Sequence, residues 1–205
     1  MLDGGKIMRF WELRLDVKNY ATLTFVDKTL SRRLISRFIV GKPFSEPWEA
    51  VQVYYPRTWE EPGLSAKERN IMRALREGRP VGDFIYIAGA EGAFAINERA
   101  RSVLFPLLVG RVELLPLYYG NERLHLVNVI SVIDCLDEDR SKVERFPSTG
   151  LIFKVIEPVF KEELLEGVHI FKFAKNSFIF VSDVFKKMVE EHNLKGLYWT
   201  PHQSP

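Results

Sequence analysis

The chain has 205 residues, of which 46% are hydrophobic and 13% aromatic, so it can build a sizeable apolar core. Lys and Arg number 29 against 27 Asp and Glu, and this near balance argues against a dedicated nucleic-acid binder, which usually carries a basic excess on one face. A single cysteine excludes an internal disulfide, and no apolar run approaches the roughly 18 residues of a membrane helix.

The N-terminus lacks the apolar segment of a signal peptide, and we therefore expect a cytoplasmic protein without membrane partners. Residues 1–7 have the composition of a flexible tail, and Met8 is a candidate for the natural start because predicted structure follows it at once. The length favours one domain, residues 8–201, with two intimate lobes, 8–80 and 81–201, as the open alternative.

Alternation of apolar and polar residues predicts strands in the first part of the chain, and a three- to four-residue apolar spacing predicts a helix. The predicted elements are the strands 10–16, 21–26 and 50–55 and the helix 30–38. Ser65 and Glu68 then stand at the spacing of a capping box, which predicts the start of a second helix. Ile71, Met72 and Leu75 form the apolar stripe of this helix.

Residues 124–134 form the strand signal around which the rest of the chain is organised. The segment is rich in β-branched residues, contains no Gly or Pro, and is apolar on both faces. It is therefore predicted to be a central strand that is covered on both sides. The preceding strand, 111–118, should pair with it as an antiparallel hairpin, and Pro116 predicts an edge position or a bulge there.

Hairpins dominate the second half of the chain, and its helices do not alternate regularly with strands. Its other predicted elements are the strands 84–87, 151–156, 169–173, 178–181 and 197–200, a helix that Asn97 caps and that Pro106 kinks or ends near Leu104, and a helix that Ser182 caps and that Asn193 and Gly196 end. We therefore expect an α+β fold with a mostly antiparallel or mixed sheet, a buried central strand and about three to four helices.

The sequence contains no phosphate-binding glycine loop and no recognisable metal or serine-nucleophile motif. Its four histidines lie far apart without ligand spacing, so we expect neither a metal ion nor another cofactor. Cys135 is the candidate thiol nucleophile, but His125 would stand about 33 Å away along an extended strand. His169 has no position relative to Cys135 that the sequence indicates. We therefore interpret Cys135 as a small structural residue and expect no catalysis.

The acidic segment Asp137, Glu138 and Asp139 follows the central strand directly. A divalent cation is one possible ligand for it, although cation sites usually draw their ligands from several spaced positions. We favour a helix N-terminus, in which Asp137 is the cap, the next two carboxylates complement the helix dipole and Arg140 pairs back. The residues by themselves thus predict an α+β domain without a catalytic centre.

The segment around the end of the central strand, residues 128–141, resembles the signature of immunity protein family eleven, formerly catalogued as a domain of unknown function. The signature positions in this chain are Asn128, Asp134, Cys135, Asp137 and Arg140. Weaker similarities keep their order and spacing elsewhere in the chain, at residues 10–13, 41–43, 82–84, 97–99, 167–173, 181–186 and 194–197.

This resemblance implies a non-catalytic immunity protein that binds and neutralises a cognate toxin of a bacterial polymorphic-toxin system. Such proteins are encoded beside the toxin and protect the producing cell and its kin during bacterial competition. The alternative hypothesis is an enzyme or small-ligand-binding protein with a cleft near Cys135, His169 and the acidic segment Asp137–Asp139.

The loop between the strand 50–55 and the second helix is the candidate toxin-binding surface. Prolines and charged residues predict that it is exposed, and it contains Tyr, Trp and Arg, the residue types most enriched in interface hot spots. The candidate partner-binding residues are Tyr55, Arg57, Trp59, Glu60 and Glu61. Trp59 either covers the core or anchors the partner, with Glu60 and Glu61 on the polar rim.

Overall fold

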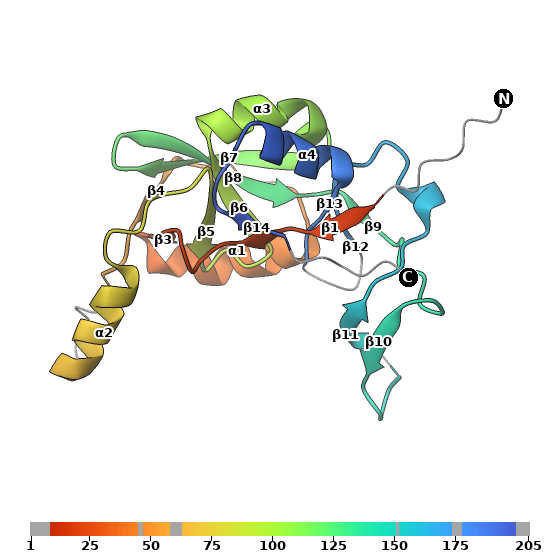
Figure 1. Cartoon of the computed structure of the whole chain (residues 1–205), viewed down its shortest axis with the longest axis horizontal. Coiled ribbons are helices and arrows are strands. Elements are labelled where there is room, and N and C mark those ends of the chain that lie inside the picture. Colours follow the sequence, from red (N-terminus) through yellow and green to blue (C-terminus); the bar gives the residue numbers. More distant parts are fainter. Residues whose placement is uncertain (1–8, 45–46, 58–62, 151, 174–177, 200–205) are drawn as a thin grey trace.

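The computed structural model describes residues 9–44, 47–57, 63–150, 152–173 and 178–199. At its centre is a closed barrel of strands in the order β3-β4-β7-β8-β6-β5 (Figure 1). These strands are β3 (Thr22–Phe25), β4 (Val51–Tyr54), β5 (Phe84–Ala88), β6 (Ala93–Asn97), β7 (Val112–Tyr119) and β8 (Glu122–Val129). A mixed sheet and several helices surround the barrel, so the predicted α+β class is confirmed.

Strand β8 lies between β7 and β6 and pairs antiparallel with both. Leu124 and Leu126 pack into an apolar cluster to which every strand of the barrel contributes. Val127 and Val129 pack into another cluster, which includes side chains from the helices α3 (Glu98–Leu108) and α4 (Asp183–Glu191). All four side chains are 0% exposed, which confirms the prediction of a central strand covered on both faces.

The central strand ends at Val129, and not at residue 134 as predicted. The backbone N–H groups of the next two residues both donate to the carbonyl of Arg111, at 3.0 and 3.1 Å, and the chain leaves the barrel there. The segment Val132–Ile133 forms a separate strand, β9, which pairs parallel with β12 (Ile170–Phe173). Of the two residues of β9, Ile133 is partly buried and packs against the apolar cluster around Cys135, whereas Val132 is 39% exposed.

The mixed sheet beside the barrel has the strand order β1-β13-β12-β9. The prediction of one strand over 10–16 is wrong, because its two parts pair with different partners. Between these parts, Leu13 is buried and donates its N–H to the carbonyl of Ile179 at 2.8 Å. The strands concerned are β1 (Phe10–Glu12), which pairs with β13 (Phe180–Ser182), and β2 (Arg14–Leu15), which pairs with β14 (Leu197–Tyr198).

Strand β7 lies inside the barrel, between β4 and β8, so the edge position predicted from Pro116 is wrong. The ladder with β4 begins at Leu117, one residue beyond the proline. The N–H that Pro116 lacks therefore leaves no gap in that ladder. Its carbonyl accepts a hydrogen bond from the indole Nε1 of Trp48 at 2.9 Å.

Three of the helices begin at the predicted caps. Ser65 and Glu68 form a complete capping box, Asn97 accepts the N–H of Ala100, and Ser182 accepts the N–H of Phe185. The α-helices of the described residues are α1 (Lys28–Val40), α2 (Ala66–Arg76), α3 (Glu98–Leu108) and α4 (Asp183–Glu191). None of these helices is long and apolar enough to cross a membrane.

Helix α3 continues past Pro106 to Leu108, so of the two predicted outcomes, a kink or an end near Leu104, the end is wrong. Pro106 removes one donor from the hydrogen-bond ladder, and the helical pairing resumes after it, since the N–H of Val109 donates to the carbonyl of Phe105 at 3.2 Å. Leu104 and Leu108 are both buried in the cluster above the barrel, and their packing holds this last turn in place.

The acidic segment after the central strand does not begin a helix, which corrects the interpretation of Asp137 as a helix cap. Residues 138–140 form a turn, in which the carboxylate of Asp137 accepts the backbone N–H of Arg140 at 3.2 Å. The chain then enters a hairpin that extends away from the barrel (Figure 1). Its strands are β10 (Lys142–Arg145) and β11 (Ile152–Glu157).

Lys172 in β12 is completely buried, and its ammonium group donates a hydrogen bond to the carbonyl of Phe38 in α1. Burial lowers the pKa of Lys172 from 10.5 to about 8. Between these two values the unfolded chain binds more protons than the folded chain, so the free energy of unfolding increases with pH in this window.

We expect the wild-type protein to gain about 2 kcal/mol of stability relative to Lys172→Met between about pH 8 and about pH 10. Urea unfolding of both proteins across this range measures the difference, and the comparison cancels the titration of groups that the two proteins share. The same pH dependence in both proteins would contradict a desolvated ammonium group at Lys172.

Candidate functional site

Cys135 is completely buried in a small apolar cluster with Leu165 and Val168. Burial raises the pKa of its thiol to about 12, so the thiol stays protonated near neutral pH and is a poor nucleophile. The imidazole Nδ1 of His169 lies 2.9 Å from the hydroxyl of Ser182, and burial lowers the pKa of this histidine. Within the described ranges, no group of three His, Cys, Asp or Glu side chains is placed to hold a metal ion.

The other residues of the family-like signature have mostly structural contacts. Asn128 is 0% exposed, and its amide donates to the carbonyl of Lys42 at 2.9 Å and to the carboxylate of Glu113 at 3.1 Å. It therefore ties the end of β8 to the segment after α1. Asp134 and Arg140 are exposed, and the guanidinium of Arg140 lies 3.9 Å from the carboxylate of Asp137.

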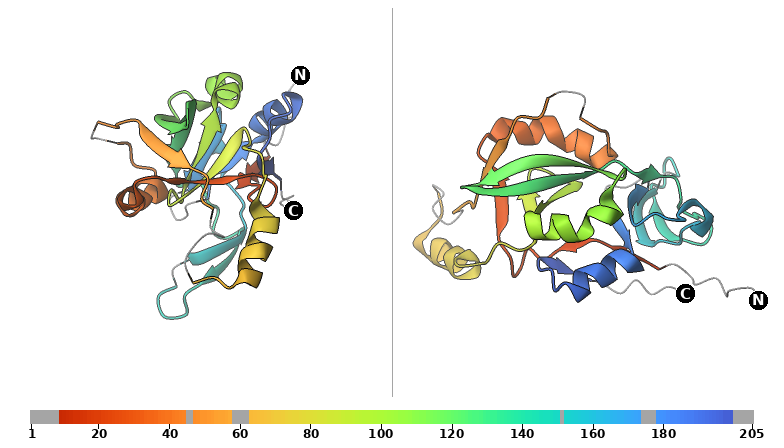
Figure 2. Two further views of the ribbon diagram at one scale, coloured as in Figure 1. Left: turned by 90° about the vertical axis from the view of Figure 1, so that its left-hand side faces the viewer. Right: turned by 90° about the horizontal axis from the view of Figure 1, so that it is seen from above.

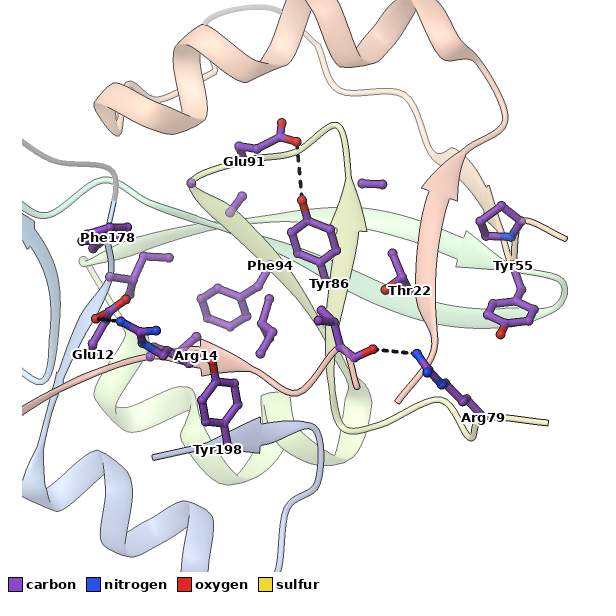
Figure 3. A pocket seen from close by; sticks show the side chains of 18 of the residues that line it. Glu12, Arg14, Thr22, Tyr55, Arg79, Tyr86, Glu91, Phe94, Phe178 and Tyr198 are labelled. Carbon is purple, nitrogen blue, oxygen red and sulfur yellow. Dashed lines mark hydrogen bonds and ion pairs between the residues drawn. The ribbon is translucent and has the colours of Figure 1, made fainter. Parts of the chain in front are cut away.

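A pocket of about 760 Å³ opens between the barrel and the N-terminal strands (Figure 3). Strands β5 and β6 provide one wall, β1 and β2 provide another, and the end of α2 reaches the rim. Neither Cys135 nor His169 lines this pocket, so it does not correspond to the cleft of the alternative hypothesis. Its polar lining residues include Glu12, Arg14, Thr22, Tyr55, Arg76, Arg79, Tyr86, Glu91 and Tyr198, and its apolar ones include Ala88, Ala93, Phe94 and Ile179.

Two buried polar atoms in this pocket have no hydrogen-bond partner among the described residues. They are the Nε of Arg14 and the Oε2 of Glu91. The terminal nitrogen of Arg14 is paired with the carboxylate of Glu12 at 2.7 Å, so only the inner N–H is unmatched. The other carboxylate oxygen of Glu91 accepts a long hydrogen bond, 3.5 Å, from the hydroxyl of Tyr86, and burial raises the pKa of that tyrosine (Figure 3).

The rim of the pocket connects the predicted binding loop to the body of the protein. The hydroxyl of Tyr55 donates to the carbonyl of Arg76 at the end of α2. The guanidinium of Arg79 donates to the carbonyl of Val17 at 2.8 Å. Of the predicted partner-binding residues, Tyr55 lines the pocket and Arg57 is exposed. Trp59, Glu60 and Glu61 lie outside the described residues.

Helix α2 projects from the barrel (Figure 2), and its last residue, Arg76, lines this pocket. None of its residues is buried, and two members of its apolar stripe, Ile71 and Leu75, are 49% and 59% exposed. Basic side chains flank the stripe, namely Lys67, Arg69, Arg73 and Arg76, whereas Glu68 is engaged in the capping box. An isolated helix of this length is marginally stable in water, so the capping box contributes to its persistence. We call the exposed stripe and its basic flanks the α2 face.

A second pocket, of about 610 Å³, lies where α3 begins beside β8. The carboxylate of Glu98 accepts a hydrogen bond from Arg101 at 2.8 Å and lies 2.7 Å from the Nε2 of His125. Arg101 and then His125 lower the pKa of Glu98 to about 2. Among the described residues, this pocket contains no buried polar side-chain atom that lacks a hydrogen-bond partner.

No local sequence signal singles out Arg14, Tyr86 or Glu91 as site residues. Each one alternates with apolar neighbours or stands in a turn, as solvent-facing residues commonly do. They meet in one pocket because β2, β5 and the turn after β5 pack together in the folded chain. The exposure of the α2 face is likewise a property of the tertiary structure.

Comparison with known protein families identifies the C-terminal part of the chain. Residues 119–204 match the Immunity protein family (Imm11), and this match confirms the family resemblance over that segment. No curated protein matches the chain. The matched segment contains β8 and the strands β9, β12 and β13 of the mixed sheet, but it supplies only Phe178, Ile179 and Tyr198 to the lining of the larger pocket.

Proposed function

We propose that this chain, in which residues 119–204 match the Imm11 immunity protein family, binds and neutralises a cognate bacterial polymorphic toxin. The family match carries this proposal. In this role the protein acts in the cytoplasm of the producing cell, protects it during bacterial competition, and recognises a toxin domain that a neighbouring gene encodes.

Neutralisation by binding, without catalysis, is the mechanism that the chemistry favours. The thiol of Cys135 is buried and protonated near neutral pH. His169 lies beside the hydroxyl of Ser182, and neither of these residues lines a pocket described above. An inhibitor needs no such constellation, since it only has to cover or distort the toxin.

The α2 face is the surface that we assign to the toxin. Ile71 and Leu75 expose large aliphatic side chains on a helix that buries none of its residues, and exposed apolar groups of this kind mark interaction surfaces. The surrounding basic side chains favour a toxin surface with an apolar centre and an acidic rim. We also propose Tyr55, Arg57, Trp59, Glu60 and Glu61, from the loop before α2, as toxin-binding residues.

Co-expression tests the proposed function directly. The toxic C-terminal domain encoded by the neighbouring gene should stop growth of a host cell, and this protein should restore growth and co-purify with that domain. A toxin domain from an unrelated system serves as the specificity control. Growth arrest that persists, together with the absence of a complex, would reject the proposal.

The double variant Ile71→Asp and Leu75→Asp tests the assigned surface. We expect it to weaken toxin binding by about 2 kcal/mol or more, because two apolar anchors become charged and face an acidic rim. Its melting temperature should change little, since both positions are largely exposed. Calorimetric titration and thermal melting provide the two measurements.

Leu164→Asp is the matched control for this variant, because Leu164 is 46% exposed and lies in the short 3₁₀ helix Glu162–Leu164, away from α2. It should bind the toxin with wild-type affinity. A lower melting temperature with unchanged affinity in the double variant would assign the stripe to folding and would remove α2 from the interface.

A further inference from the structure

We propose that the larger pocket captures a basic side chain, a lysine or an arginine on an inserted polypeptide segment, with Glu91 as its counter-ion. The inference rests on the proposed function, because the segment belongs to the bound toxin. It adds a defined recognition site to the α2 face. It also assigns a chemical class to the group that enters the pocket.

The carboxylate of Glu91 is the group that requires a ligand. Its Oε2 is buried and has no hydrogen-bond partner among the described residues, and its Oε1 has only the long contact with Tyr86. A buried carboxylate oxygen without a donor is unfavourable, and an ammonium or guanidinium group supplies both the donor and the opposite charge. Within the described ranges, no basic side chain of the chain itself forms an ion pair with Glu91.

The backbone holds Glu91 in position beside the pocket. The next residue, Gly92, has a φ of +86°, and a Cβ at that position would lie 2.9 Å from the carbonyl oxygen of Phe38 in α1. The turn is therefore pressed against α1 and has little freedom to swing the carboxylate into solvent. A site of this kind is already formed before its ligand binds.

The rest of the lining selects a long basic side chain over a small ion. Phe94, Ala88 and Ala93 present an apolar surface on which an aliphatic stem can pack. The unmatched Nε of Arg14 is a donor, and it suits a backbone carbonyl of the inserted segment. The guanidinium of Arg14 is already neutralised by Glu12, so its charge does not repel an incoming cation as an unpaired arginine would.

The two parts of the surface then impose opposite requirements on the partner. The basic flanks of the α2 face favour acidic groups, whereas Glu91 favours one basic group at the pocket. This combination orients the partner, because the reversed arrangement would place like charges together.

Short blocked peptides test the pocket by itself. The probes are acetylated and amidated Ala-Arg-Ala, Ala-Lys-Ala and Ala-norleucine-Ala, and binding is followed by NMR titration of the backbone amides. The two basic peptides should shift the amides of Tyr86, Ala88 and Phe94 and should bind about tenfold more tightly than the norleucine peptide. Equal binding of all three peptides, or shifts elsewhere, would overturn the inference.

Two variants and one control sharpen this test. Glu91→Gln should weaken binding of the arginine peptide about tenfold. Glu191→Gln, which changes an exposed carboxylate on α4, should leave the affinity for this peptide unchanged. Ala88→Leu fills the pocket from its wall and should also reduce binding, which keeps the test valid if Glu91→Gln folds poorly. Wild-type affinity in both pocket variants would contradict the inference.

The same variants in complex with the toxin domain separate the two proposals. If the wild-type protein binds the toxin and Glu91→Gln binds it equally well, the pocket inference fails and the proposed function stands. If the wild-type protein does not bind the toxin, the proposed function fails, whatever the peptide titration shows. Weaker toxin binding by Glu91→Gln, with Glu191→Gln unchanged, supports both.

Discussion

Val129→Asp is expected to unfold the protein. Val129 is the last residue of the central strand, is 0% exposed, and packs between the barrel and the helices above it. A carboxylate buried there would lose its hydration, which costs roughly 4 kcal/mol or more against a total stability of about 5–15 kcal/mol. Far-ultraviolet circular dichroism and thermal melting measure the loss.

Val109→Asp is the matched control, because it makes the same chemical change at a residue that is 60% exposed just after α3. It should melt within a few degrees of the wild type. If Val129→Asp also keeps the wild-type melting temperature, β8 is not the buried centre of the barrel.

Gly196→Ala is the second substitution with a large expected effect. Gly196 has a φ of +105°, and a Cβ there would lie 2.2 Å from the carbonyl oxygen of Phe84. At this close approach, the backbone carbonyl of Lys195 accepts the N–H of Phe84 at 2.9 Å. The backbone carbonyl of Gly196 accepts the N–H of Asp16 at 2.8 Å. Alanine adds backbone strain and a steric clash, so we expect a loss of about 3 kcal/mol or more, measured by urea unfolding.

Gly110→Ala separates these two causes. Gly110 has a φ of +70°, but nothing lies within 4 Å of the place that a Cβ would occupy, so alanine brings backbone strain without a clash. Its expected cost is about 1 kcal/mol. Equal losses of unfolding free energy for the two alanine variants would show that the segment after α4 does not pack closely against β5.

Local sequence signals predicted several elements of the fold correctly. The capping box at Ser65 and Glu68 and the cap at Asn97 both begin helices. The hairpin of β7 and β8 and the two-sided burial of β8 also follow from the pattern of apolar residues. These features depend on neighbours a few residues apart, which is the range over which such patterns carry information.

Other predictions were wrong because they depended on distant partners. The segment 10–16 splits where Leu13 meets Ile179, and the central strand stops where Arg111 accepts two backbone hydrogen bonds. Pro116 lies inside the barrel because the β4 ladder begins one residue later. In each case the partner strand comes from a part of the chain that is distant in sequence, and the local alternation of side chains does not indicate that partner.

The sequence by itself determined the α+β class, the helix caps, the central strand and the family resemblance, which the match over residues 119–204 confirms. Only the tertiary structure decided that the strands close into a barrel, that α2 exposes Ile71 and Leu75, and that Arg14 and Glu91 line one pocket with unmatched polar atoms. The physical reason is that the periodicity of apolar residues records which face of an element avoids water. It does not record which part of the chain, or which partner, covers that face.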